Sequence, residues 1–294
     1  MNILVTGGTG FIGSALTNSL RQGGHAVVIL SRSVRQSEEG CRYVNSLSEL
    51  GGDIKIDGVI NLAGASLAGK RWSSRYKQEI FSSRLDTTRA LVAWLSERDR
   101  KPEIMISASA IGYYGQHGDE VLAEDGAVVP GFAQDLCQQW ENEALKAAQL
   151  GIRVCLARLG VVLDRDGGAF VEMARPFRFG VANWMGSGRQ WLSWVHRADV
   201  IAALLFLLEH PVLSGPFNIT APEPVTSRGF CDAMKRHKRT LLTAPVPAAA
   251  MRLLVGEMAD ELLLSGQRVV PEALLSAGFE FRFSDLDAAL AEIL

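Results

Sequence analysis

Three glycines near the start of the chain could bind the diphosphate of a dinucleotide. Gly7, Gly10 and Gly13 lie in "ILVTGGTGFIGSAL", directly after an apolar stretch typical of a strand and at the start of a predicted helix. In such a pattern the first glycine permits a tight turn, the second lets the backbone approach a diphosphate, and the third allows close helix packing. Backbone amides at the start of the helix would then bind the phosphates. A glycine-rich turn without a ligand is the alternative, and the order of strand, glycines and helix disfavours it.

The end of the next predicted strand indicates which dinucleotide would bind. NAD-selective folds keep an acidic residue about 20 positions after the glycines, where it accepts hydrogen bonds from the adenosine ribose. Here the strand ends in "VVILSRSVR", so Ser31 and Arg32 occupy that place and Arg35 lies nearby. A guanidinium in place of a carboxylate suits a ribose 2′-phosphate. We therefore predict NADP(H) as the cofactor, with a merely solvated loop arginine as the alternative.

The elements that must position these residues follow a regular alternation. Five runs are apolar throughout, as strands covered by helices on both faces are; they span residues 2–6, 26–30, 58–63, 103–109 and 153–163. Helical stretches lie between them, around residues 12–22, 73–98 and 132–150. This alternation predicts an α/β protein with a Rossmann-type, doubly wound parallel sheet.

The pattern changes after about residue 165. We expect a loop-rich stretch of glycine and aromatic residues at 179–196, followed by a buried helix at 198–210 and a further strand at 215–220. The tail that follows is mostly helical, with a break at 243–250. We predict a nucleotide-binding core over residues 1–165. Residues 166–294 are expected to complete the sheet and to add a smaller, mostly helical domain on the substrate side.

Composition and charge exclude several classes of partner. The 294 residues are 48% hydrophobic and 21% charged, with a formal net charge of −2, which offers no clustered basic surface for nucleic acid. Four cysteines lie far apart, so neither a metal site nor a disulfide framework is expected, and reduced thiols predict a cytoplasmic protein. No apolar run approaches the roughly 20 residues needed to span a membrane. The expected partner is a small molecule, and the oligomeric state is left open.

Several motifs together resemble the extended short-chain dehydrogenase/reductase superfamily. "TGGTGFIG" matches its nucleotide signature, and the other matching segments are "NLAGA" (61–65), "SASAIGYYG" (107–115) and "WVHRADV" (194–200). More narrowly, the chain is similar to the bacterial YfcH-like epimerase family through "LCQQWE", "GVVLDRDGG", "GSGRQWLSWVH" and a family-specific tail at about 240–294. Such a resemblance implies a fold and a cofactor more firmly than it implies a reaction.

The resemblance also implies a set of cofactor contacts. Those of the glycine loop would come from Gly7, Thr9, Gly10, Phe11, Ile12 and Gly13. Ser31 and Arg32 would hold the adenosine phosphate, with Leu62 and Ala63 beneath the ribose. Glu79 and Arg84 would reach the cofactor from the opposite edge, and Val162 would offer its backbone to the nicotinamide carboxamide. For Glu79 and Arg84 a plain surface helix of mixed charge is the alternative.

The usual proton-transfer pair of the superfamily has no counterpart here. That pair is a Tyr-x-x-x-Lys motif on the helix after the fifth strand, which does the acid/base work. In "PGFAQDLCQQWENEALKAA" (130–148), alignment on Glu141 puts Ala133 at the tyrosine position and Cys137 at the lysine position. Alanine has no proton to transfer, and a thiol is not cationic. We expect the helix to be kept for packing, with Cys137 as a small apolar group.

Candidates for the remaining chemistry lie at the end of the strand predicted at 103–109 and just after it, at the edge where α/β folds bind ligands. Ser109 matches the superfamily serine that hydrogen-bonds a substrate oxygen, although one extra residue before "YYG" leaves the register open. Tyr113 and Tyr114 come next, and each has a structural role as its alternative. Ser109, Tyr113 and Tyr114 are the predicted catalytic set.

Two further segments could contact a substrate. Lys70 and Arg71 could bind an anionic group, and Trp72 beside them could serve equally as a packing anchor. Arg189 lies among the glycines and tryptophans of residues 180–194, which suit either a lip over a sugar-like ligand or a loop held by buried tryptophans.

These features predict an NADP(H)-binding, atypical short-chain dehydrogenase/reductase. The expected activity is that of an epimerase or reductase acting on an anionic or sugar-nucleotide-like substrate. A catalytically inactive NADP(H)-binding sensor or scaffold is the alternative. The missing Tyr/Lys pair favours the sensor, whereas the serine segment and the basic residues favour the enzyme.

Overall fold

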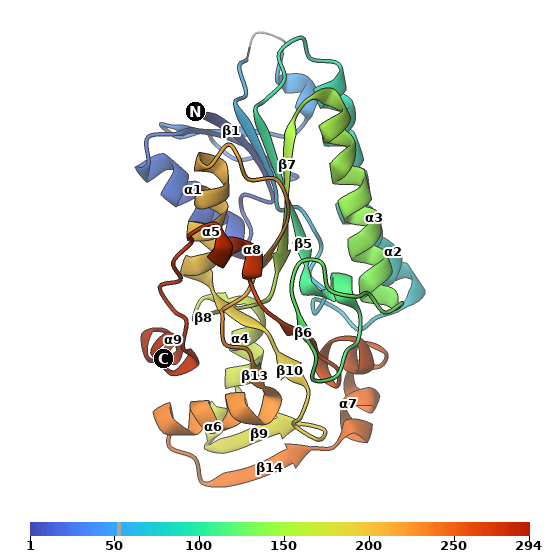
Figure 1. Cartoon of the computed structure of the whole chain (residues 1–294), viewed down its shortest axis with the longest axis vertical. Coiled ribbons are helices and arrows are strands. Elements are labelled where there is room, and N and C mark those ends of the chain that lie inside the picture. Colours follow the sequence, from blue (N-terminus) through green and yellow to red (C-terminus); the bar gives the residue numbers. More distant parts are fainter. Residues whose placement is uncertain (52–53) are drawn as a thin grey trace.

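A seven-stranded parallel sheet forms the centre of the computed structural model, which describes residues 1–51 and 54–294 (Figure 1). The strands follow one another in the order β12-β7-β5-β4-β1-β2-β3, and every neighbouring pair is parallel. They are β1 (Asn2–Thr6), β2 (Ala26–Leu30), β3 (Cys41–Val44), β4 (Gly58–Asn61), β5 (Ile104–Ala110), β7 (Arg153–Leu159) and β12 (Gly215–Ile219). The strand order reverses between β1 and β4, and such a reversal opens a crevice at the carboxyl ends of the strands. The predicted doubly wound class is confirmed.

Helices cover both faces of this sheet, as the apolar strands require. Figure 1 shows α1 (Phe11–Gln22) and α5 (Arg197–Glu209) on one side, and α2 (Ser74–Ser96) and α3 (Phe132–Leu145) on the other. Successive residues of β1 point to opposite faces. Accordingly Ile3 packs in the cluster formed with α1 and α5, and Leu4 in the cluster formed with α2 and α3.

The rest of the described chain builds a smaller lobe at the carboxyl edge of the sheet. Its strands pair two by two: β8 (Val161–Asp164) with β11 (Trp194–His196), β9 (Val181–Met185) with β14 (Leu242–Val246), β10 (Trp191–Leu192) with β13 (Val225–Thr226), and β6 (Val121–Leu122) with β15 (Arg268–Val269). Its helices are α4 (Gly168–Ala174), α6 (Ser227–His237), α7 (Ala248–Val255) and α9 (Leu286–Ile293), whereas α8 (Glu272–Ser276) packs on the main sheet, with Leu274 in the core cluster that includes α1 and α5. Short helical turns complete the chain: η1 (Leu47–Glu49), η2 (Ile111–Tyr114), η3 (Lys146–Leu150), η4 (Pro176–Phe179) and η5 (Ala259–Leu263). The boundary at residue 165 stays a prediction.

The run at 153–163, expected as one strand, is divided at Gly160. The first part is β7 of the main sheet, whereas the second is β8, which pairs with β11 instead. A Cβ on Gly160 would lie 2.5 Å from the Ser193 carbonyl oxygen, so only glycine fits where the chain leaves the sheet. The loop-rich stretch expected at 179–196 contains three short strands, because each finds a partner strand from elsewhere in the sequence.

The sequence also led us to expect no disulfide, no metal site and no membrane-spanning helix. All four cysteines are buried free thiols. Within the described residues, no group of three or more His, Cys, Asp or Glu side chains is placed to hold a metal ion. Among the helices described, none combines the length and the apolar character needed to cross a membrane.

Candidate functional site

The glycine loop between β1 and α1 is packed too closely for side chains. Gly7 has a φ of +67°, in the left-handed region that favours glycine, and a Cβ there would lie 2.6 Å from the Leu62 carbonyl oxygen. A Cβ on Gly13 would lie 2.2 Å from the Gly7 carbonyl oxygen. The helix start therefore lies directly on the turn that precedes it. The steric roles expected of the first and third glycines are thus seen in these contacts.

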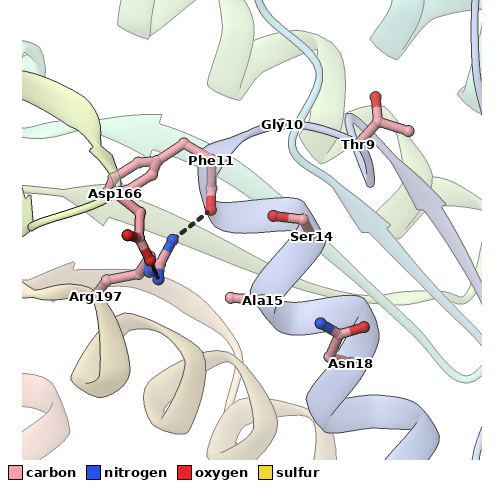
Figure 2. A pocket seen from close by; sticks show the side chains of 8 residues that line it. All are labelled: Thr9, Gly10, Phe11, Ser14, Ala15, Asn18, Asp166 and Arg197. Atoms are coloured by element: carbon pink, nitrogen blue, oxygen red, sulfur yellow. Dashed lines mark hydrogen bonds and ion pairs between the residues drawn. The ribbon is translucent and has the colours of Figure 1, made fainter.

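The start of α1 offers backbone donors for an anion. Gly10 precedes the helix without a side-chain cap, and the first turn of α1 has no acidic residue. The Ser14 amide donates to the Gly10 carbonyl at 2.9 Å, whereas the first amides of a helix have no intrahelical partner. Figure 2 shows Thr9, Gly10 and Phe11 at this end of α1. They line one end of a hollow of about 540 Å³ that extends along α1 to Asn18. The amides and the positive end of the helix dipole together suit a diphosphate.

The residues after β2 present a free arginine. The Ser31 hydroxyl is buried, donates to the Ser33 carbonyl at 3.0 Å and accepts from the Ser33 amide at 3.2 Å. Asn45 donates to the Ser31 carbonyl at 2.8 Å, which fixes the turn from β3. Arg32 is exposed, and within residues 1–51 and 54–294 it makes no ion pair. Its guanidinium therefore remains available for an anionic ligand.

A buried network of polar side chains supports the loop after β4. The Thr6 hydroxyl donates to Asn61 Oδ1 at 2.7 Å and accepts from the Ala63 amide at 3.2 Å. Asn61 Nδ2 donates to the Thr88 hydroxyl at 2.8 Å, and Trp140 Nε1 donates to the same hydroxyl at 3.0 Å. Because each of these buried polar groups has a hydrogen-bond partner, burying them costs little folding free energy. The network holds Leu62 and Ala63 in place under the glycine loop. Sequence reasoning missed Asn61, which takes part in two of these four bonds.

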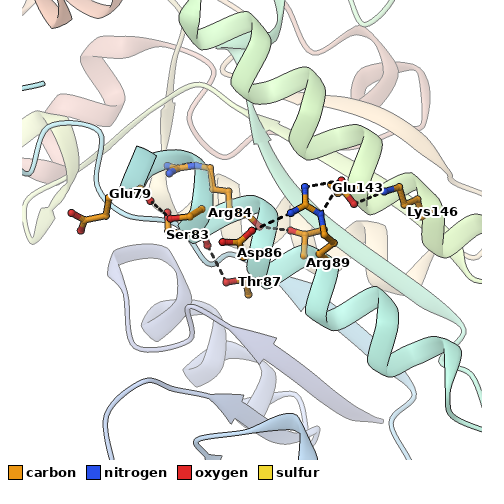
Figure 3. A network of polar contacts seen from close by, with 10 residues as sticks. Glu79, Ser83, Arg84, Asp86, Thr87, Arg89, Glu143 and Lys146 are labelled. Carbon is orange, nitrogen blue, oxygen red and sulfur yellow. Dashed lines mark hydrogen bonds and ion pairs between the residues drawn. The ribbon is translucent and has the colours of Figure 1, made fainter. Parts of the chain in front are cut away.

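Arg84 and Glu79, both on α2, have different surroundings (Figure 3). Arg84 donates to the carbonyls of Ile80 and Ala65, both at 3.0 Å, and a Cβ on Gly64 would lie 2.9 Å from its guanidinium carbon. Burial lowers the pKa of Arg84. Glu79 is exposed and pairs with Lys70 at 3.3 Å. Arg84 thus braces the loop after β4, and the contact of either residue with a cofactor stays a prediction.

The predicted catalytic serine lies in a buried ionic cluster. Ser109 is 2% exposed, and its hydroxyl donates to Glu141 Oε1 at 2.7 Å. Glu141 also makes a bidentate pair with Arg158, with both N–O distances at 2.9 Å. Burial opposes the charge on Arg158, but the contact with Glu141 outweighs it and holds the pKa of Arg158 above its usual range. The Ser109 hydroxyl is therefore engaged with the protein.

The two predicted catalytic tyrosines differ in whether their hydroxyl groups are bonded to the protein. Tyr114 is fully buried; its hydroxyl accepts from Arg158 at 3.0 Å and donates to Asn218 Oδ1 at 2.7 Å, and burial raises its pKa. Tyr113 is half-buried, and its ring centroid lies 3.5 Å from the Arg158 guanidinium carbon. In the part of the chain that the structure describes, the Tyr113 hydroxyl has no hydrogen-bond partner. Of the three candidates, Tyr113 is therefore the one with a hydroxyl to offer a substrate.

The helix expected to have lost its chemistry is closely packed against η2. A Cβ on Gly112 would lie 3.1 Å from the Ala133 Cβ and 3.6 Å from Cys137 Sγ. A larger side chain at Ala133 would thus meet the η2 turn. Cys137 is buried, and burial raises its pKa to about 12, so the thiol stays neutral and packs as a small apolar group.

Two glutamates missed by the sequence reasoning connect this region to later parts of the chain. Glu124 accepts from the amides of Asn218, at 2.9 Å, and Ala273, at 3.1 Å, and burial raises its pKa. Glu261 Oε2 accepts from the Ala133 amide at 3.4 Å, at the start of α3.

Arg158 was also missed, although a charged residue inside the apolar run "RVCLARL" is a usable signal, since a buried charge requires a partner.

The segments proposed to face a substrate are mostly anchored by their aromatic residues. Trp194 is fully buried and donates to the Glu223 carbonyl at 3.0 Å. Trp72 donates to the Leu67 carbonyl at 2.8 Å and packs on Phe132 with ring centroids 4.7 Å apart. These two tryptophans act as packing anchors, whereas Arg189 is exposed.

Comparisons with known proteins cover the whole chain. The family model described as "NAD dependent epimerase/dehydratase family" matches residues 3–220, and a domain of unknown function, DUF1731, matches residues 246–293. The epimerase family protein YfhF of Bacillus subtilis (strain 168) is 39% identical over 300 residues, covering 100% of this chain and 98% of its own. The crystal structure of human epimerase family protein SDR39U1 (isoform 2) with NADPH has a TM-score of 0.90 and 32% identity, covering 100% and 99% of the two chains. The nucleoside-diphosphate sugar epimerase from Corynebacterium glutamicum has a TM-score of 0.80 and 30% identity, and this chain spans 58% of its length.

Proposed function

Because the chain belongs to the NAD-dependent epimerase/dehydratase family, we propose that it is an NADP(H)-dependent epimerase or reductase. Its substrate is a small molecule, anionic or like a sugar nucleotide. The observation that carries the cofactor choice is Arg32 just after β2, which is exposed and has no ion pair among the described residues, in the place where NAD-selective folds keep an acid. The NADPH in the structure of the human relative supports the same choice.

The residues present fit such a cofactor. Side chains at Gly7 and Gly13 would collide with backbone, so the loop keeps the open amides of α1 turned to a diphosphate. Those amides and Arg32 would hold the two ends of the adenosine half, with Leu62 and Ala63 under the ribose. When bound, the nicotinamide ring accepts or donates a hydride.

Tyr113 would handle the substrate oxygen. Its hydroxyl, which has no partner among the described residues, can donate a hydrogen bond to that oxygen, and the Arg158 guanidinium, 3.5 Å from the ring centroid, holds the ring in place. Arg158 keeps its own charge because Glu141 is paired with it.

The cofactor choice is tested by charge reversal at Arg32. Wild-type protein and the Arg32→Asp variant are titrated with NADPH and with NADH, following nicotinamide fluorescence or heat. We expect the wild type to bind NADPH at least tenfold more tightly and the variant to lose that preference, since a charge-assisted contact contributes about 1.5–3 kcal/mol. Arg100→Asp is the matched control, because Arg100 is an exposed arginine just before β5, at the opposite edge of the sheet. An unchanged preference in Arg32→Asp would refute the assignment.

A sensor without catalysis is the second candidate. The buried Ser109 hydroxyl and the small residues Ala133 and Cys137 favour it. Carbonyl compounds and sugar nucleotides are screened for a change in nicotinamide absorbance with wild type, Tyr113→Phe and Tyr114→Phe. Turnover that is lost in Tyr113→Phe supports the enzyme, and tight NADPH binding without turnover across the panel supports the sensor.

A further inference from the structure

The turn between β8 and α4 packs against the first residue of α1. This turn carries the sequence "DRDGG" (164–168), which the assignment of function leaves without a role. A Cβ on Gly167 would lie 2.8 Å from Cδ2 of the Phe11 ring, and a Cβ on Gly168 would lie 2.8 Å from its Cε1. Gly168 also has a φ of +68°. The two glycines are therefore required for the Phe11 ring to lie against the turn.

Arg197, the first residue of α5, contacts Phe11 as well (Figure 2). Its guanidinium carbon is 4.9 Å from the Phe11 ring centroid, and Nη1 lies 3.5 Å from the Phe11 carbonyl oxygen. Two carboxylates orient the guanidinium: Nε is 3.0 Å from Asp164 Oδ2, and Nη2 is 3.1 Å from Asp166 Oδ2. Asp164 in turn accepts from the Asp166 amide at 2.9 Å. Each group that touches Phe11 is thus itself held in place.

We propose that Asp164, Gly167, Gly168 and Arg197 form a clamp on Phe11 that positions the cofactor diphosphate. The inference rests on the proposed NADP(H) binding. Phe11 carries the first amide of α1, and fixing its ring fixes the direction of that amide. A donor that is already oriented loses no conformational freedom when the ligand binds, so affinity rises.

The same clamp connects the cofactor loop to the smaller lobe. Asp164 ends β8, and Arg197 follows β11, its partner strand. A Cβ on Gly168 would also lie 2.9 Å from the carbonyl oxygen of Val162, the residue expected at the nicotinamide carboxamide. One turn therefore lies beside the contacts predicted for both the diphosphate and the nicotinamide.

The test compares NADPH with adenosine 2′-monophosphate, which keeps the 2′-phosphate but has no diphosphate. We expect Arg197→Met to raise the Kd of NADPH about tenfold and to leave the Kd of adenosine 2′-monophosphate within twofold, both measured on protein shown to be folded by circular dichroism. Arg165→Met is the matched control, since Arg165 belongs to the same turn but contacts the Glu292 carbonyl on α9; its NADPH affinity stays that of the wild type.

A double-mutant cycle separates positioning from direct contact with the ligand. If Arg197 acts through Phe11, Phe11→Leu and Arg197→Met raise the Kd of NADPH by similar factors. The Kd of the double variant is then no higher than that of the single variant with the higher Kd. Additive losses would mean that Arg197 binds the ligand itself and would overturn the proposal. Arg197→Lys, which keeps the charge but not the planar guanidinium, is used if Arg197→Met does not fold; a threefold or greater loss is expected.

Other outcomes are equally decisive. An unchanged NADPH affinity in the Arg197 variants, or an equal loss for both ligands, overturns the clamp, because the second pattern indicates general loosening of the loop. Failure of the wild type to bind NADPH refutes the proposed function and removes the clamp's role with it. Normal NADPH binding by wild type with unaffected Arg197 variants refutes the clamp alone.

Discussion

The two halves of the sheet's carboxyl edge treat their polar residues in opposite ways. At the β1–β2 end, the first amides of α1 have no side-chain cap, and the exposed guanidinium of Arg32 has no ion pair within the part of the chain that the structure describes. At the β5–β7 end, Ser109, Glu141 and Arg158 are buried and bonded to one another. Unpaired donors at an edge are suited to a ligand, whereas a satisfied buried network specifies structure. The comparison separates the features suited to binding a ligand from those that stabilise the structure.

Removal of Arg158 is expected to give the largest difference between the two ends. Arg158→Met leaves Glu141 as an uncompensated buried charge, and such a loss costs about 3–5 kcal/mol. Arg32→Met, an identical change at the open end, is expected to alter the free energy of unfolding by about 0.5 kcal/mol or less. Urea denaturation at pH 7 measures both. Equal effects of the two substitutions would contradict the division drawn here.

The neighbouring tyrosines sharpen the comparison within the buried end. Tyr114→Phe removes a hydroxyl bonded to both Arg158 and Asn218, and we expect it to lower stability by about 1–2 kcal/mol. Tyr113→Phe removes a hydroxyl without a protein partner among the described residues and keeps the ring on Arg158, so stability stays within about 0.5 kcal/mol. Thermal unfolding followed by circular dichroism distinguishes them. The reverse order would show that Tyr113 is the structural residue.

The smallest expected effect is a dependence on pH. Burial raises the pKa of Glu124 above its ordinary 4.5, so the folded protein favours the protonated acid. Stability from this group is present at low pH and is lost as pH rises from about 4.5 through the raised pKa. Glu124→Gln removes the titrating group and with it that loss; its single oxygen can accept from only one of the two amides of Asn218 and Ala273, a cost that is the same at every pH. Relative to wild type, the variant should gain about 1 kcal/mol or less between pH 4 and pH 7, measured by urea denaturation; a relative loss over that range would contradict the sign.

Most of the main sheet was predictable, because buried parallel strands are apolar on both faces. Residues 2–6 and 26–30 were placed as β1 and β2 with the observed bounds. β3 was not predicted, since "CRYV" is short and mixes polar with apolar residues. The prediction of a single strand over 153–163 was wrong. The chain leaves the main sheet at Gly160, where Ser193 and Thr220, both distant in sequence, approach too closely for a side chain.

The candidate site was predictable only where its signal is local. Spacing alone placed Gly7 and Gly13, since their turn and the following helix are contiguous. The surroundings of Ser109 and Tyr114 depend on Glu141, Arg158 and Asn218, which come from three other elements. No local pattern could show that these two hydroxyls have partners, so the half-buried Tyr113 was not distinguishable from Tyr114 beforehand.

By itself the sequence determined the alternation of strands and helices, the glycine turn, and the arginine after the second strand, because each depends on residues adjacent along the chain. Only the tertiary structure decided which polar side chains are accessible to a ligand and which are hydrogen-bonded within the protein. It set the Phe11 ring against Gly167 and Gly168, and it buried Ser109 on Glu141 while leaving Tyr113 open. The physical reason is that a hydrogen bond or an ion pair is satisfied by whichever partner the fold brings within reach, and those partners lie tens to more than a hundred residues away.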